Sequence, residues 1–258
     1  MWRGIDVSEN QGVIDWGQVA ASGVQFAILR SVRRSGKADG QFSANLEGCR
    51  TYGIRTAVYK YTYAVTREQV ETEICQIAEL LKNYGLDGTG MMIWWDVEDR
   101  ETLQPLGRTK LTELIRTAQA KIEAAGYRFG LYTGLYVYKE GWFDFNAFAC
   151  PVWIARYPST AQKAWNDNPS DRYKPSVGRA IWGWQWTSNG RLPGIGGAVD
   201  FDICYQDPGE WAAPEKEPGV IYTVSVADVW TRAQAEEMQK QLAAIGIQGA
   251  VHKVRILE

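Results

Sequence analysis

Two spacings of apolar residues divide most of the chain into predicted strands and helices. Short apolar segments are typical of strands, and apolar residues at every third or fourth position are typical of helices. Eight strands are predicted, at residues 3–9, 26–32, 54–63, 91–98, 128–133, 151–157, 180–187 and 199–205. Four helices are predicted, at residues 15–23, 41–53, 66–85 and 109–126. The clearest is 66–85, where apolar side chains follow the 3.6-residue period and Thr66 and Gln69 predict a capping box.

The order of these elements predicts the class of fold. The first five predicted strands alternate with helices, and the last three follow one another with little helix between them. Repeated βα units favour parallel strands, and about 210 residues of them predict a closed α/β barrel. In such barrels the functional side chains collect at the C-terminal ends of the strands.

Residues 208–219, PGEWAAPEKEPG, interrupt this pattern. Their three prolines, two glycines and alternating charges predict a linker. Beyond it, residues 220–258 have the order strand, helix, strand, which predicts one small βαβ unit. The sequence therefore predicts a barrel domain at 1–207, a linker at 208–219 and a small unit at 220–258.

The composition makes several classes of function improbable. The formal net charge is −2 and no basic patch stands out, so a nucleic-acid partner is not expected. No apolar run approaches ~18 residues, so membrane insertion is not expected. The N-terminal segment lacks the apolar core of a secretory signal. We therefore expect export by another route, or action where the protein is made or released.

The histidine and cysteine content narrows the chemistry further. The only histidine is His252, which disfavours Ser-His-Asp and Cys-His catalysis and His-ligated metal sites in the predicted barrel. The four cysteines are scattered without a CxxC pair, so a disulfide framework or zinc site is not expected. We predict no metal and no cofactor. Carboxylates, tyrosines and tryptophans remain as the available chemical groups.

Acidic residues stand at the ends of predicted strands. Asp6 lies on the first strand, Asp96 and Glu98 end the fourth, and Asp200 and Asp202 lie on the last. Because the first and last strands of a closed barrel are neighbours, we expect Asp6 and Asp200 to lie together. Asp96 and Glu98 share one strand face, roughly 6.6 Å apart along the strand. Carboxylates that flank a scissile sugar bond need separations of roughly 5–9.5 Å.

Structural roles or metal binding could also explain these acids. They could cap loops or pair with Arg30, Arg33 or Arg156, or they could hold magnesium or calcium. No calcium loop and no phosphate-cradling glycine motif is present, however, and four of the acids converge on one end of the barrel. The same strand ends carry the aromatic segments IWWD, LYTGLYVY, VWIARY and IWGWQWT. Most of these rings are expected to fill the core, and a minority would offer flat faces to sugars.

The chain resembles the family 25 glycoside hydrolases in four segments that occur in order: GIDVSENQGVIDW, WWDVED, VWIARY and WGWQWTSNGRLPGIGGAVDFDIC. Members of this family are N-acetylmuramidases, or lysozymes, of bacteria and bacteriophages, and the resemblance covers roughly residues 2–206. It implies a flattened (β/α)5(β)3 TIM-like barrel. It also implies hydrolysis of the β-1,4 bond between N-acetylmuramic acid and N-acetylglucosamine in peptidoglycan, with net retention.

The resemblance also implies roles for individual residues. Glu98 matches the proton donor, and Asp96 matches the carboxylate beside it. Asp6 and Asp200 match the acids that complete the cleft. Asp202 stands where the family often has Asn, so it is left outside the catalytic set. The positions that line the family's cleft are matched by Tyr63, Tyr132, Trp153 and Gln185.

Several alternatives are open from the sequence alone. Asp96 could attack the anomeric carbon, or it could orient the substrate's own N-acetyl group, which then attacks instead; the family is usually interpreted in the second way. A non-catalytic glycan-binding barrel would explain the aromatic residues but has no need of converging acids. A glycosidase acting on another polysaccharide would share the acids but not the four segments.

The resemblance also bears on location and assembly. We expect action at the bacterial cell wall, as a phage or prophage endolysin released through a lesion made by another protein, or as an autolysin exported by an unusual route. The unit at 220–258 resembles half of a SPOR-like domain, a peptidoglycan-associated fold. Its open strand edges and apolar helix stripe predict a homodimer through residues 220–258, with packing on the barrel or wall binding as alternatives.

Overall fold

The computed structural model describes residues 1–207. Its strands are β1 Trp2–Val7, β2 Phe26–Arg30, β3 Arg55–Tyr61, β4 Met92–Asp96, β5 Arg128–Gly134, β6 Val152–Ala155, β7 Lys163–Ala164, β8 Gly183–Arg191 and β9 Val199–Cys204. Its α-helices are α1 Trp16–Ala21, α2 Phe42–Thr51, α3 Arg67–Asn83, α4 Arg108–Ala124 and α5 Leu135–Glu140. Short 3-10 helices lie at Glu9–Gln11, Gln104–Leu106, Phe145–Ala147 and Asp171–Tyr173.

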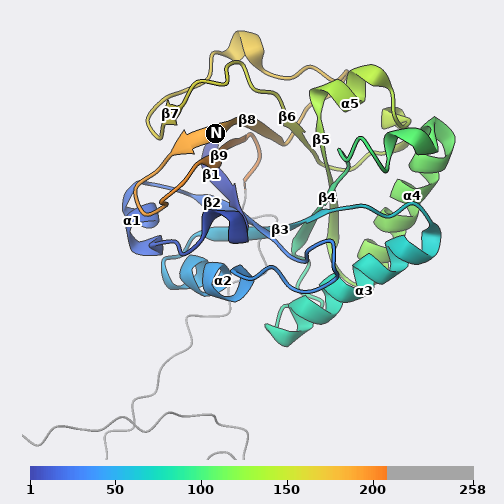
Figure 1. Cartoon of the computed structure of the whole chain (residues 1–258), viewed down its shortest axis with the longest axis horizontal. Coiled ribbons are helices and arrows are strands. Elements are labelled where there is room, and N and C mark those ends of the chain that lie inside the picture. The colour runs from blue at the N-terminus through green and yellow to red at the C-terminus, as the bar shows by residue number, and fades with distance from the viewer. Residues whose placement is uncertain (208–258) are drawn as a thin grey trace, which may run out of the picture. The chain divides into compact units, whose positions relative to one another are not determined.

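Eight of the strands form a closed barrel. They follow the order β6-β5-β4-β3-β2-β1-β9-β8, and the pairing of β6 with β8 closes the ring. The pairings from β1 to β6 are parallel, and so is the pairing of β6 with β8. In Figure 1 the strands lie at the centre, and the helices α1 to α5 surround them. The predicted eight-stranded α/β barrel is therefore confirmed.

The strands separate two apolar layers. Alternate side chains point into the barrel, where Phe26 and Trp94 pack together with other large rings. The side chains between them, such as Ile93, pack into the larger core under the helices. Because successive side chains of a strand point to opposite faces, this alternation fixes the direction of the strand-end acids. Asp6 and Asp96 fall on the inner face.

One strand departs from the expectation of parallel pairing. β9 runs antiparallel to both of its neighbours, β8 and β1. The connection between β8 and β9 contains only residues 192–198, whereas a parallel crossover needs about a dozen residues or more. The chain therefore turns back directly after β8, and β9 completes the barrel in the reverse direction.

Side chains cap the starts of two helices, and the predicted Thr66 and Gln69 capping box is formed only in part, because the Gln69 side chain accepts from the N–H of Val65. Asp15 accepts a hydrogen bond from the backbone N–H of Gln18 at 3.1 Å where α1 begins. Thr66 accepts one from the N–H of Gln69 at 3.3 Å where α3 begins. The short helix α5 and the two-residue strand β7 were not predicted, because neither segment is long enough to show a period.

The remaining sequence predictions fall on other parts of the chain. The linker at 208–219 and the SPOR-like unit at 220–258 lie outside the described residues, so the domain boundaries and the homodimer stay predictions. Within residues 1–207, no helix combines the length and the apolar character that crossing a bilayer requires.

Candidate active site

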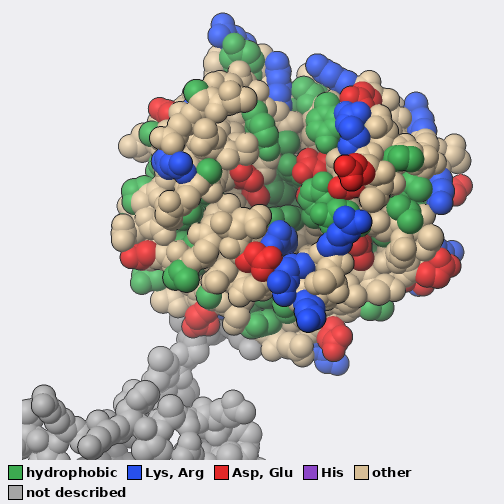
Figure 2. All heavy atoms as spheres, viewed as in Figure 1, with side chains coloured by type: hydrophobic (Ala, Val, Ile, Leu, Met, Phe, Trp, Pro, Cys, Tyr) green, Lys and Arg blue, Asp and Glu red, His purple; other side chains and the backbone are tan. Residues whose placement is uncertain are grey.

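The predicted acids converge on one end of the barrel. Asp96 is the last residue of β4, and Glu98 follows two residues later. Asp6, near the end of β1, pairs in register with Asp200 on β9. The side chains of Asp6 and Asp96 are only 6% and 4% exposed, whereas Glu98 and Asp200 are partly exposed. Figure 2 shows acidic side chains around a hollow in the molecular surface, with hydrophobic side chains at its base.

The reversed direction of β9 places Asp200 in this group. Asp200 is the second residue of β9, and in a strand parallel to β1 it would lie at the far end of the barrel from Asp6. Because β9 is antiparallel to β1, its first residues lie beside the last residues of β1. The predicted proximity of Asp6 and Asp200 is confirmed, and the antiparallel pairing is its structural cause.

The amide of Gln185 connects the acids of β1 and β9 to two tyrosines. Its Nε2 donates to Oδ2 of Asp6 at 2.7 Å and lies 3.4 Å from Oδ2 of Asp200. Its Oε1 accepts from the hydroxyls of Tyr132 at 2.8 Å and Tyr157 at 2.6 Å. Every polar atom of the buried amide is therefore used, and the network holds side chains of β1, β5 and β8 in fixed relative positions.

Glu98 has the electrostatic setting of a general acid. Its pKa is raised from 4.5 to about 7, first by burial and second by the negative charge of Asp99. A hydrogen bond with Tyr132 acts in the opposite direction. Near neutral pH this carboxyl is therefore divided between its protonated and ionised forms.

Asp96 is more deeply buried and has an uncommitted oxygen. Burial raises its pKa, and the charges of Glu98 and Asp6 raise it further. Lys60 opposes this shift, but its ammonium is 3.2 Å from the carboxylate of Glu73. Oδ1 of Asp96 is buried and accepts no hydrogen bond from any residue between 1 and 207. A buried carboxylate oxygen without a donor is costly, so this atom is suited to receive a donor from a bound molecule.

Ion pairing does not account for the strand-end acids. Arg30 pairs with Glu9 at 2.7 Å and with Asp39 at 2.6 Å. Arg33 also faces Glu9, at 3.5 Å, and Arg156 lies over a tyrosine ring. In the described part of the chain no ion pair reaches the acids at the barrel mouth. The same residues contain no group of three or more His, Cys, Asp or Glu side chains arranged to hold a metal ion.

The four predicted substrate-binding residues lie at different depths. Tyr63, in the segment after β3, is partly exposed; its ring centre is 4.8 Å from that of Tyr61 and 4.4 Å from the guanidinium carbon of Arg34. The other three are 2–4% exposed, namely Tyr132, Trp153 and Gln185. These buried side chains support the acids from within the barrel, so Tyr63 alone of the four offers an accessible ring. Direct contact with a substrate stays a prediction for all four.

Two tyrosines of the site were not predicted. Tyr157 follows the end of β6 by two residues and donates to Gln185. Tyr136 follows the end of β5 by two residues and donates to the backbone oxygen of Glu98 at 2.9 Å. Glu98 itself has the same spacing from the end of β4, and Tyr63 has it from β3. In extended chain a residue two positions beyond an inward-facing strand terminus is directed toward the mouth, so this spacing could have identified Tyr157. Tyr136 lies in the first turn of α5, where the alternation of a strand no longer applies.

A closed α/β barrel with paired carboxylates at the C-terminal strand ends defines the architecture of a barrel glycosidase. The chain belongs to the glycosyl hydrolases family 25, whose family model matches residues 5–195. It is 25% identical over 207 residues to lysozyme M1 of Streptomyces globisporus. That match covers 77% of this chain and 66% of the relative, so the chain spans slightly less than two thirds of the relative's length.

Solved structures give the same fold. The bacterial lysozyme of Streptomyces coelicolor is similar with a TM-score of 0.64 and 23% identity, over 80% of this chain and 93% of that one. The modular autolysin LytC of Streptococcus pneumoniae, in complex with a synthetic peptidoglycan ligand, is similar with a TM-score of 0.65 and 26% identity, over 79% of this chain and 46% of that one. The TIM-like α/β barrel implied by the family resemblance is thus the observed fold class.

Proposed function

We propose that this protein hydrolyses the β-1,4 bond between N-acetylmuramic acid and N-acetylglucosamine in bacterial peptidoglycan, with net retention. The observation that carries the proposal is Glu98, a partly buried carboxyl with its pKa raised to about 7 beside Asp96 at the barrel mouth. Family membership and the similarity to a lysozyme and to an autolysin support the choice of substrate. The site of action would be the bacterial cell wall.

Glu98 serves as the general acid in this proposal. A protonated Glu98 donates its proton to the glycosidic oxygen as the bond to the leaving sugar breaks. The ionised carboxylate that results then accepts a proton from the water that completes hydrolysis. A pKa of about 7 suits both steps, because a group that titrates near the working pH can give and take the proton with little driving force lost.

Asp96 stabilises the positive charge that develops at the anomeric carbon. Its buried position strengthens that interaction, because the surroundings screen charge less than water does. It either attacks the anomeric carbon or accepts the N–H of the substrate's N-acetyl group, whose carbonyl oxygen then attacks. We favour the second role, because the free Oδ1 provides an acceptor for such an N–H.

The other predicted residues hold these two carboxyls and the sugar. Asp6 and Asp200 complete the cleft, and Gln185 fixes their orientation. Tyr132 contacts both Gln185 and Glu98. Tyr63 provides the exposed ring against which a sugar can pack. Trp153 is buried inside the barrel and supports the acids from below the cleft.

The products from purified cell walls test the proposal. A muramidase creates new reducing ends on N-acetylmuramic acid, so borohydride reduction followed by acid hydrolysis should yield muramitol. Glucosaminitol instead would indicate cleavage of the other glycosidic bond and would contradict the proposed specificity. Wall binding without new reducing ends would indicate a glycan-binding barrel. Activity on another polysaccharide, with none on walls, would indicate a glycosidase with a different substrate.

A further inference from the structure

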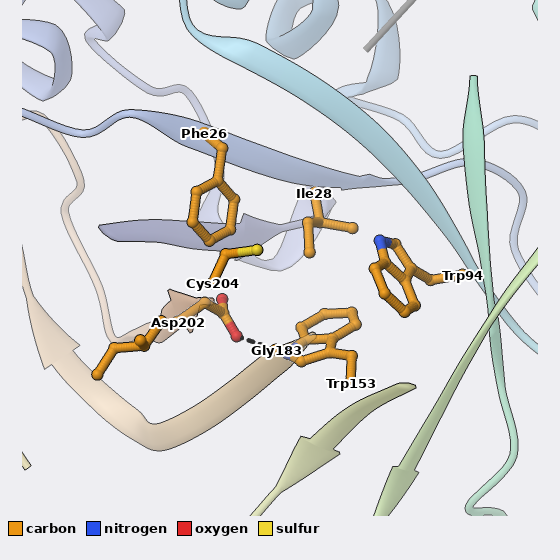
Figure 3. Close-up of a pocket in the computed structure, with 8 residues that line it drawn as sticks. Phe26, Ile28, Trp94, Trp153, Gly183, Asp202 and Cys204 are labelled. Atoms are coloured by element: carbon orange, nitrogen blue, oxygen red, sulfur yellow. Dashed lines mark hydrogen bonds between the residues drawn. The ribbon is translucent and has the colours of Figure 1, made fainter. Parts of the chain in front are cut away.

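A fifth carboxylate, Asp202, lies inside the barrel beneath the proposed catalytic group. It is 2% exposed, and its place on β9 is in register with Gly4 of β1 and Gln185 of β8. Figure 3 shows its side chain directed into the barrel, toward the indole of Trp153. Burying an ionised carboxylate is costly unless each oxygen has a donor, so the partners of this side chain decide its charge.

Only one oxygen of Asp202 has such a donor. Oδ1 accepts the indole N–H of Trp153 at 2.8 Å. Oδ2 is buried and receives no hydrogen bond from any residue between 1 and 207. Asp202 borders a cavity of about 10 Å³ whose other lining side chains are apolar or weakly polar: Phe26, Ile28, Trp94, Trp153, Ile203 and Cys204. A cavity of this size is at the lower limit for one water, which would need two or more polar partners.

The carboxyl group of Asp6 is the partner that remains. Asp6 is in register with Asp200, and Asp202 is the next residue of β9 on the same inner face, diagonally across from Asp6. The carboxyl of Asp6 contacts those of both Asp202 and Asp200, and its Oδ2 also accepts from Gln185. Two ionised carboxylates have no donor between them, so such a contact requires a proton on one of them. We propose that Asp202 and Asp6 share one proton, and that Asp202 is a positioning residue that holds Asp6 in the active site.

The surrounding charges favour the shared proton. Burial and the charge of Asp200 raise the pKa of Asp202, and burial and the charge of Asp202 raise that of Asp6. The other titratable groups that face the pair also have raised pKa values; they are the carboxyls of Asp96 and Asp200, the hydroxyls of Tyr59, Tyr132 and Tyr157, and the thiol of Cys204. Among residues 1–207, no Lys or Arg forms an ion pair with either acid. The pair is therefore best described as one titrating unit.

Infrared spectroscopy of the full chain and its Asp202→Asn variant tests the proton directly. The amide of the variant can donate to Asp6 and accept from Trp153, so the contacts survive without the proton. The spectrum of wild type minus variant at neutral pH should contain one protonated carboxylic acid band, sensitive to deuteration, and no change in carboxylate. The surface variant Glu113→Gln should show the loss of one carboxylate instead. A carboxylate loss in Asp202→Asn as well would overturn the proposal.

Thermal unfolding gives an independent readout. The unfolded chain releases the protons of both acids near their ordinary pKa values of roughly 4, whereas the folded pair keeps one to higher pH. Wild type therefore loses stability relative to Asp202→Asn as the pH rises from roughly 4 to the higher pH at which the folded pair releases its shared proton. The melting-temperature difference should grow with pH in favour of the variant, while Glu113→Gln shows no such trend. A difference that is constant with pH would contradict the shared proton.

Kinetics on cell walls then test the positioning role, and this step alone rests on the proposed function. Asp202→Asn should keep kcat within about threefold of wild type, whereas Asp202→Leu, which cannot hold Asp6, should lose on the order of tenfold or more in kcat with KM little changed. Equal losses in both variants would remove the positioning role. An inactive wild type would instead contradict the proposed hydrolysis, and the spectra and melting curves would still decide whether the proton is shared.

Discussion

The charge of Asp99 contributes to the pKa of Glu98, so Asp99→Asn tests the general acid without altering it. The pKa of Glu98 is raised from 4.5 to about 7, with burial as the larger cause and Asp99 as the second. Asp99 therefore supplies less than half of the upward shift. A like charge at a partly exposed site contributes about 1 kcal/mol, and one pKa unit is about 1.4 kcal/mol. We expect the substitution to lower the pKa of Glu98 by on the order of one unit.

The structure indicates that asparagine fits at position 99. Oδ1 of Asp99 accepts the backbone N–H of Thr102 at 3.0 Å and its hydroxyl at 2.8 Å. Oδ2 accepts the hydroxyl of Tyr61 at 3.2 Å. An amide oxygen can keep both bonds to Thr102, and the Tyr61 oxygen can accept from the amide nitrogen. The variant therefore removes a charge and conserves the local contacts.

The pH dependence of kcat/KM for release of reducing ends is the assay. Glu98 must be protonated, so the rate falls about tenfold per pH unit above its pKa. A lower pKa moves this fall to lower pH. Asp99→Asn should match wild type near pH 5 and be roughly tenfold slower near pH 8, while Glu113→Gln matches wild type throughout. The reasoning is refuted if the alkaline limb stays in place, or if Asp99→Asn loses the same factor at every pH.

Asp96→Asn should lower kcat more than it raises KM, since the charge acts on the transition state; a covalent glycosyl-enzyme trapped on Asp96 would exclude the N-acetyl-assisted version. Exhaustive chelation should leave activity unchanged, and activity that vanishes and returns with a divalent cation would show that the acids were misinterpreted. In light scattering the full chain should be dimeric and a chain ending at Asp207 monomeric; a monomeric full chain at micromolar concentration would end the dimer hypothesis.

The barrel could be predicted because its strands and helices have distinct periods. The apolar run at 91–95 reads as a buried strand, and it is one, with Asp96 at its end. The direction of β9 could not be read from its residues, since VDFDIC has the same alternation in either direction. What decides it is the length of the connection from β8, which the sequence offers only once the strand ends are known.

The candidate site was predictable in its acids and less so in its supporting network. Strand-end carboxylates stand out against apolar segments, so Asp96 and Glu98 can be identified from the sequence alone. The burial of Trp153 cannot be predicted in this way, because an aromatic residue on an inward strand face can either fill the barrel or line its mouth. Gln185 joins β8 to side chains far away along the chain, and Tyr157 completes that contact. Such long-range pairing depends on barrel closure.

The central claim is that Glu98 donates the proton that breaks a glycosidic bond in peptidoglycan. Its most direct test is the rate of reducing-end release from purified walls by wild type and Glu98→Gln at equal concentration, with matched circular dichroism and melting curves. The amide keeps the shape of the side chain but has no acidic proton. The account predicts a loss on the order of 10²–10⁴ with folding intact. A folded Glu98→Gln protein that cleaves walls at nearly the wild-type rate would contradict it.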